Sequence, residues 1–193
     1  MLKNIIKIVF GLIMVVSVII GYLPEPEYLH ELTCISNTAG GIVLIIDAIL
    51  NIRKNKHVHP AIFLNVAVCI FSVFLVCVGS LTGLYGKFNF KGAFFILHVI
   101  APIVFIGFYF VFINEQQRKW RAVFTAPIMM LSYLLFDYIQ CQFTGKFVYG
   151  LVDTEMMTLQ NTAIAGVMMY AIMCLFGGGI FGINRLIHRK AKQ

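Results

Sequence analysis

The chain has 193 residues, of which 60% are hydrophobic and only 12% are charged, whereas a soluble domain is about half apolar and about a quarter charged. Its mean hydropathy of +0.90 excludes an ordinary soluble protein and indicates an integral membrane protein. The net charge of +7 would suggest a nucleic-acid partner in a soluble chain, but here the basic residues lie in short segments between apolar stretches. We therefore expect no nucleic-acid partner, and a single domain over residues 1–193.

Six apolar segments are each long enough to cross about 30 Å of hydrocarbon as a helix. The first follows a basic start, as in a signal peptide, but the GYLPEP after it is a poor cleavage site, so we expect a retained helix. Proline, glycine and charged residues separate the segments. The sequence therefore predicts an all-α fold, a polytopic bundle of six transmembrane helices. The predicted helices cover residues 5–23, 29–52, 60–82, 92–113, 122–142 and 160–186.

The basic residues are distributed asymmetrically between the two ends of this bundle. Of the 15 lysines and arginines, only Lys87, Lys91 and Lys146 fall on one side. The others belong to the two termini and to the segments after the second and fourth helices. Because basic segments stay in the cytoplasm, both termini are predicted to be cytoplasmic.

The second segment begins with a polar cluster in the stretch ELTCISNTAGG, residues 31–41. At about 100° per residue, its polar and small residues fall on one face of a helix, and isoleucines fall on the other faces. This polar face consists of Thr33, Ser36, Asn37, Gly40, Gly41, Leu44, Asp47 and Asn51. Such a face is typical of close helix packing with hydrogen bonds across the interface. It can equally form a functional site.

Three side chains with reactive groups are predicted to lie in the outer half of the membrane: Thr33, His98 and Asp137. His98 is the only histidine inside a predicted membrane segment, and an ionisable residue there is a functional candidate by default. It suits proton transfer near neutral pH, and so the activation of the Thr33 hydroxyl as a nucleophile. Ser36 and Asn37 are candidates to stabilise the charged intermediate. Asp137 is a candidate to orient His98.

Three stretches together resemble one known family: LTCISNTAGGIVLII, ILHVIAPIVFIGFYF and FTAPIMMLSYLLFDY. They carry the short motifs T-x-x-S-N and L-H-x-x-x-P, then a helix with proline and tyrosine. The chain is similar, over nearly its whole length, to the androgen-induced and FAR-17a-like family of six-helix membrane proteins and its bacterial relatives. The resemblance implies an intramembrane hydrolase that cleaves esters between a fatty acid and a hydroxy fatty acid. It places Thr33 and His98 at the positions of the family's nucleophilic threonine and its histidine.

The resemblance also implies a pocket beside these two residues. Tyr133 belongs to the helix with proline and tyrosine, and YGLVDTE resembles a loop of the bacterial members without its prolines. We expect Tyr133, Tyr149 and Asp153 to line the pocket, and a long-chain acyl ester to reach it from the membrane lipids. No cofactor and no metal are expected. The expected location is a bacterial plasma membrane, with the site nearer the extracytoplasmic face.

Two other functions stay open from the residues alone. The polar face of the second helix continues to Asp47 and Asn51 near the inner surface, as a transporter or a proton path would need. A non-catalytic bundle, in which Thr33 bonds a backbone carbonyl or His98, is the third reading. The five cysteines are scattered singly without a C-x-x-C pair, so they predict neither a metal site nor a redox site.

Overall fold

The computed structural model describes residues 1–81, 90–115, 118–148 and 158–190, and over these ranges it contains helices and no strand. Six helical spans are long and apolar enough to cross a membrane. This confirms the predicted all-α membrane fold. The elements are α1 (Leu2–Tyr22), a short 3₁₀ turn (Pro26–Tyr28), α2 (Leu32–Lys54), α3 (Pro60–Leu81), α4 (Ala93–Phe95), a π-helical turn (Ile96–Ile100), α5 (Ala101–Phe112), a second 3₁₀ turn (Trp120–Thr125), α6 (Ile128–Thr144) and α7 (Leu159–Lys190).

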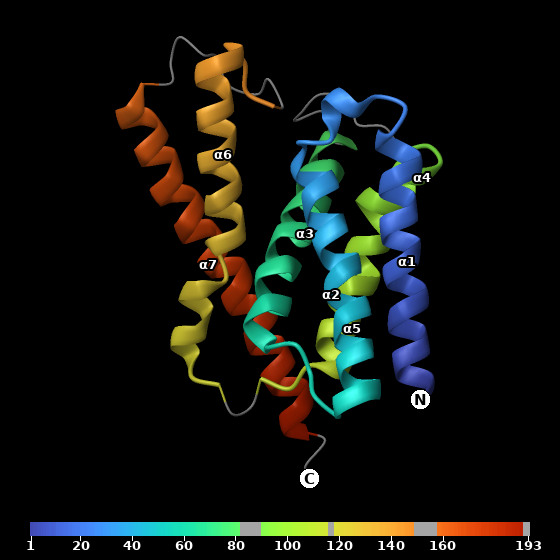
Figure 1. Ribbon diagram of the computed structural model, residues 1–193. Helices are drawn as coiled ribbons and strands as arrows, with labels where there is room; N and C mark the ends of the chain where they lie inside the picture. The colour runs from blue at the N-terminus through green and yellow to red at the C-terminus, as the bar shows by residue number, and fades with distance from the viewer. Residues whose placement is uncertain (82–89, 116–117, 149–157, 191–193) are drawn as a thin grey trace.

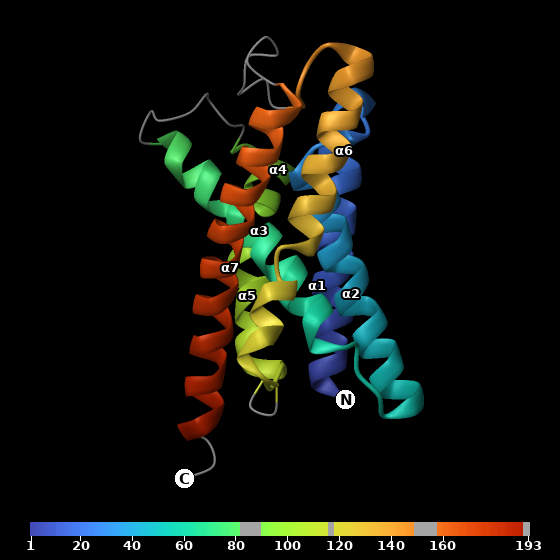
Figure 2. The ribbon, with the colours of Figure 1, turned by 90° about the vertical axis from the view of Figure 1, so that its left-hand side faces the viewer.

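Two pairs of helices lie on either side of α3, and the span that contains α4 and α5 packs against α3 and α1. Figure 1 shows α1 and α2 on one side, α6 and α7 on the other, and α3 between them. The quarter-turn in Figure 2 shows the N-terminus and the last turns of α7 at the same end of the bundle. The ends of α2 and α5 lie there too, so the basic segments gather at this end, called the inner end below. The opposite end is called the outer end.

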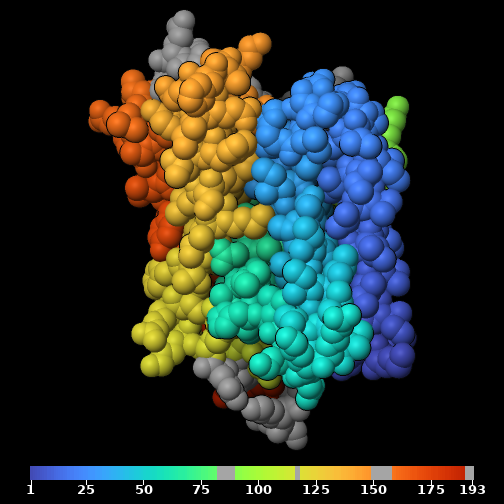
Figure 3. All heavy atoms as spheres, in the orientation of Figure 1, coloured from blue at the N-terminus to red at the C-terminus, as the bar shows by residue number. Residues whose placement is uncertain are grey.

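The central position of α3 follows from its sequence. A helix that is apolar all round is suited to a fully covered position, and α3 carries few polar residues. Its buried positions run round the whole helix, and the space-filling view shows it recessed between the lower parts of α6 and α2 (Figure 3). Buried side chains of α3 include Phe63, Leu64, Ala67, Val68, Ile70 and Ser72.

The polar face predicted for the second helix is buried in the structure, and its glycines meet α1. A methyl group on Gly41 would lie 2.7 Å from the carbonyl oxygen of Gly11, and a methyl on Gly11 would lie equally close to that of Gly41. Only glycines allow two helix backbones to approach so closely. Ile42 and Ile46, on the other faces, are exposed to the surroundings of the bundle.

Two prolines interrupt the helices that carry the candidate site. Pro102 has no N–H to donate to the carbonyl of His98, four residues earlier, so the regular helical bond at that place is absent. The chain opens there into the π-helical turn, which contains His98. Pro127 separates the second 3₁₀ turn from α6 in the same way. These breaks have the local causes that helix kinks usually have.

A buried ion pair joins α1 to α2 at the inner end. The Lys7 Nζ lies 2.6 Å from the Asp47 Oδ2, and both side chains are almost fully excluded from solvent. The other carboxylate oxygen accepts the backbone N–H of Val58 at 2.8 Å, and the His57 Nδ1 lies 3.2 Å from it. The inner part of the polar face therefore has structural partners.

A second buried carboxylate, that of Glu115, lies just after the inner end of α5. Glu115 accepts two bonds from Arg118, at 2.7 and 2.9 Å, and one from the hydroxyl of Tyr109 at 2.9 Å. The Asn184 amide of α7 donates to the carbonyls of Tyr109 and Ile113 at the end of α5, at 2.9 and 2.8 Å. This cluster fastens α5 to α7.

Removing Lys7 tests the first of these ion pairs. Lys7→Met leaves the Asp47 carboxylate buried without its cation, so we expect the free energy of unfolding in detergent to fall by about 3 kcal/mol or more. Lys3→Met removes an exposed lysine of the same helix and is expected to change it by less than about 0.5 kcal/mol. Equal effects of the two substitutions, measured by thermal unfolding, would contradict the assigned ion pair.

Candidate functional site

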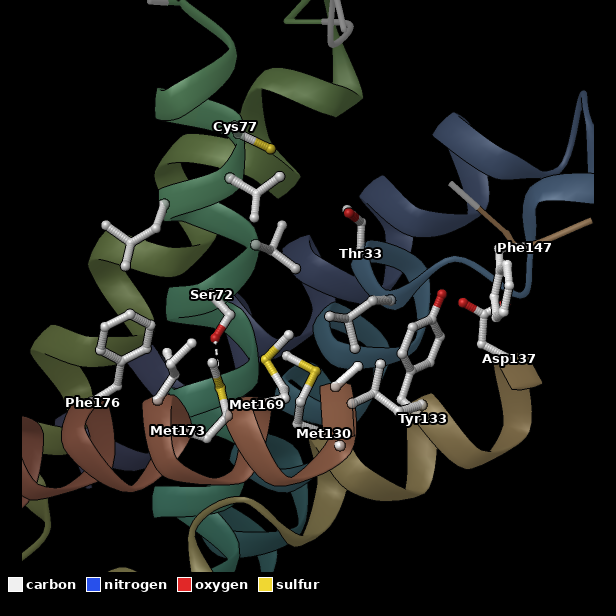
Figure 4. Close-up of a pocket in the computed structure, with 18 of the residues that line it drawn as sticks. Thr33, Ser72, Cys77, Met130, Tyr133, Asp137, Phe147, Met169, Met173 and Phe176 are labelled. Atoms are coloured by element: carbon white, nitrogen blue, oxygen red, sulfur yellow. Dashed lines mark hydrogen bonds between the residues drawn. The ribbon is translucent and has the colours of Figure 1, made fainter. Parts of the chain in front are cut away.

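A cavity of about 480 Å³ lies in the outer half of the bundle, between the start of α2, α3 and the α6–α7 pair (Figure 4). Cavities of this size hold one drug-sized or lipid-sized ligand. Its wall is mostly apolar, with the sulfur atoms of several methionines. The labelled lining residues in Figure 4 are Thr33, Ser72, Cys77, Met130, Tyr133, Asp137, Phe147, Met169, Met173 and Phe176.

Three polar side chains lie together at one end of this cavity. Thr33 is the second residue of α2 and is 1% exposed. Tyr133 and Asp137 are four residues apart on α6, so they share a face of that helix, and Figure 4 shows both near the start of α2. The predicted pocket residue Tyr133 therefore lines the cavity that Thr33 also lines.

Asn37 connects the start of α2 to the turn that contains His98. Its Nδ2 donates to the carbonyl oxygen of Thr33 at 2.8 Å and to that of Leu97 at 3.2 Å. The two carbonyls cannot be farther apart than the sum of these distances. Because Leu97 precedes His98, the backbones of the two candidate catalytic residues are held close together. Both hydrogens of the nitrogen are used in this way.

His98 is held by aromatic rings. It is 3% exposed, and its ring centroid lies 5.8 Å from that of Phe94, nearly stacked, and 6.0 Å from that of Phe90. Such contacts fix the plane of an imidazole. Turns of π-helix occur frequently at functional sites. Thr33 is among the described residues that line the cavity, and His98 is not.

Asp137 lies on the cavity wall, with its carboxylate fixed by the backbone that follows α6. The N–H of Val148 donates to its Oδ1 at 2.9 Å. The described bond to the Asp137 carboxylate comes from Val148, and the expected role of Asp137 in orienting His98 stays a prediction. Asp137 is placed to contact whatever enters the cavity beside Thr33 and Tyr133.

The remaining predicted residues have different outcomes. Ser36 is fully buried one turn after Thr33, and its hydroxyl points to the Thr33 carbonyl at 3.5 Å. Tyr149 and Asp153 lie outside the described residues. Ser72, which sequence analysis did not assign to the site, lines the cavity and donates to the carbonyl of Val68. Nothing in its local sequence distinguishes it from a packing serine of an apolar helix.

The start of α2 provides backbone donors beside Thr33. The N–H of Ile35 donates to the carbonyl of Glu31, so the N–H groups before it have no acceptor within the helix. The positive end of the helix dipole lies at the same place and favours negative charge. The Glu31 side chain accepts the hydroxyl of Tyr22 at 2.7 Å. Burial raises the pKa of Glu31, and the bond from Tyr22 partly opposes this.

Within the described ranges, no cluster of three histidine, cysteine or acidic side chains has the spacing of a metal site. The arrangement offers the Thr33 hydroxyl on a cavity wall, the turn with His98 joined to the start of α2 through Asn37, backbone donors and the carboxyl group of Asp137. These groups can perform acyl transfer by a side-chain nucleophile. In the comparisons with known proteins, no family model, no curated protein and no solved structure matches the chain.

Proposed function

We propose that the protein is an intramembrane hydrolase of long-chain acyl esters, with Thr33 as nucleophile and His98 as general base. The observation that carries this proposal is the Asn37 amide, which binds the carbonyls of Thr33 and Leu97 and so brings the start of α2 to the turn with His98. The sequence resemblance to the androgen-induced and FAR-17a-like family supports the same two residues.

The proposed reaction has two steps. The Thr33 hydroxyl attacks the ester carbonyl, and His98 takes its proton; collapse of the tetrahedral intermediate breaks the ester C–O bond and returns that proton to the leaving alcohol. Water then attacks the threonine ester, again with His98 as base, and releases the fatty acid. Hydroxyl nucleophiles need such a base because they are weak at their free pKa.

Backbone groups are the better candidates for stabilising the oxyanion. Both hydrogens of the Asn37 nitrogen are engaged by carbonyls, so Asn37 serves to position the two catalytic residues. The N–H groups of the first turn of α2 point out of the helix beside Thr33, and oriented backbone donors of this kind stabilise developing negative charge. Asp137 and Tyr133 are then assigned to substrate binding.

The shape and chemistry of the cavity support a lipid-like substrate. Thr33, Tyr133 and Asp137 lie together, and most of the remaining wall is apolar and includes Met130, Met169 and Met173. Methionine side chains adapt to flexible apolar ligands. An acyl chain can lie against them while its ester group reaches Thr33, with membrane lipids as the source of the substrate.

The described residues support a transport path through the bundle less well than they support a hydrolase. The cavity lining ends at Ser72, Met130 and Phe176, which lie near the middle of their spans. Below it, Gly177 packs on Ala126 so closely that a methyl group on the glycine would lie 2.7 Å from the alanine Cβ. Asp47, farther in, is paired with Lys7.

The hydrolase proposal is tested with purified protein and a generic long-chain ester. We expect Thr33→Ala and His98→Gln each to lower kcat by about 100-fold or more, because each removes a group that acts in the transition state. Thr38→Ala and His59→Gln are matched controls outside the site and should retain activity. Undiminished turnover in either site variant, at equal folded yield, contradicts the mechanism.

We also propose that the inner end faces the cytoplasm, so that the site lies nearer the extracytoplasmic face. The support is the gathering of lysine and arginine at that end. A fusion of a fluorescent protein, which matures in the cytoplasm, to the C-terminus is expected to be bright. An alkaline phosphatase fusion at the same position should be inactive, and the opposite pattern would reverse the topology.

A further inference from the structure

We propose that a groove at the inner end of α7 binds the phosphate of an anionic membrane phospholipid. The groove has a volume of about 310 Å³ and is separate from the cavity at the outer end. It lies between the second 3₁₀ turn and α7. Its described lining consists of Trp120, Gly182, Arg185, Leu186 and Arg189. The inference does not depend on the hydrolase proposal.

The indole of Trp120 forms one wall of this groove. It is 56% exposed and packs edge-on against Phe181 of α7, with ring centroids 5.2 Å apart. Gly182 makes room for it, since a methyl group there would lie 3.2 Å from the indole. A tryptophan in such a place marks the level of the lipid headgroups. The groove therefore opens where phosphates of the membrane are found.

Arg185 is fixed in the groove by its surroundings. Its guanidinium carbon lies 5.9 Å from the centroid of Trp120 and 5.7 Å from that of Phe181. One of its terminal nitrogens donates to the carbonyl of Arg118 at 3.2 Å. These contacts hold the guanidinium in place, and a guanidinium with its planar set of donors can bind phosphate in a bidentate manner.

Arg189 adds a second positive charge on the same face of α7. It follows Arg185 by four residues and is exposed, so the two side chains are neighbours. Like charges at this spacing repel each other in an isolated helix. An anion bound between them removes this repulsion. The two arginines beside this tryptophan therefore provide positive charge for binding one phosphate.

The apolar part of the groove favours a lipid over a free phosphate ion. Leu186 is 61% exposed and lies one turn from Gly182 on α7, next to the indole. These side chains offer a surface for the first part of an acyl chain. Nearby Arg118 is paired with Glu115, and the arginines in the described lining of the groove both belong to α7.

The test compares two lipids on the full-length protein in detergent, by native mass spectrometry with graded lipid. Phosphatidylglycerol is expected to bind about fivefold more tightly than phosphatidylcholine with the same chains, because one basic residue near the headgroups contributes about this factor. Arg189→Gln should remove most of this preference, and Arg53→Gln, an exposed arginine at the end of α2, should retain it.

Three results would overturn the proposal. One is equal binding of the two lipids by the unaltered protein. Another is an equal loss of preference in the Arg189 and Arg53 variants, which would make the effect one of general surface charge. The third is displacement of phosphatidylglycerol by excess inorganic phosphate but not by chloride at the same ionic strength, which would make the ligand a free anion.

Discussion

The amide of Asn37 is the contact on which the proposed chemistry depends. It joins the carbonyl of Thr33, at the start of α2, to that of Leu97, just before His98. Both acceptors face the nitrogen end of the amide, so its orientation is settled by the hydrogen bonds it makes. Acyl transfer needs its nucleophile and base in hydrogen-bond reach. The Asn37 contact holds the backbone at Thr33 close to the backbone at Leu97, next to His98.

Polar residues in this bundle divide into two groups according to what they face. At the inner end, Asp47 is paired with Lys7 and Glu115 with Arg118. Buried charges in a membrane protein need such partners. At the outer end, Thr33, Tyr133 and Asp137 face a cavity with room for a ligand. This difference separates residues that hold the fold together from residues available for chemistry.

Periodicity and length were enough to predict the helices and the buried face of α2. Six apolar segments require six helices in hydrocarbon, and the face with Gly41 is buried because of its helical spacing. The partner of Asp47 could not be found in this way. Lys7 lies on another helix, and from sequence it is explained equally well as one of the basic residues that keep the N-terminus in the cytoplasm. The π-helical turn at His98 was indicated locally by Pro102, which has no N–H to donate to the His98 carbonyl.

The cavity lies between α6, α7, α3 and the start of α2, and α7 meets the segment before α6 at the close contact of Gly177 with Ala126. Such side-chain contacts between distant segments leave no pattern within a single helix. Sequence analysis therefore identified Thr33 and Tyr133 but gave no reason to place Ser72 beside them. The contact between Asp137 and Val148 likewise depends on the path of the chain after α6.

Labelling by a fluorophosphonate ester with a long alkyl chain tests the central claim most directly. The reagent modifies only a nucleophile that an adjacent base has activated, and mass spectrometry of the digested protein locates the adduct. The account predicts modification at Thr33 and its loss in His98→Gln. Modification at another residue, or equal labelling of Thr33 without the histidine, would contradict it.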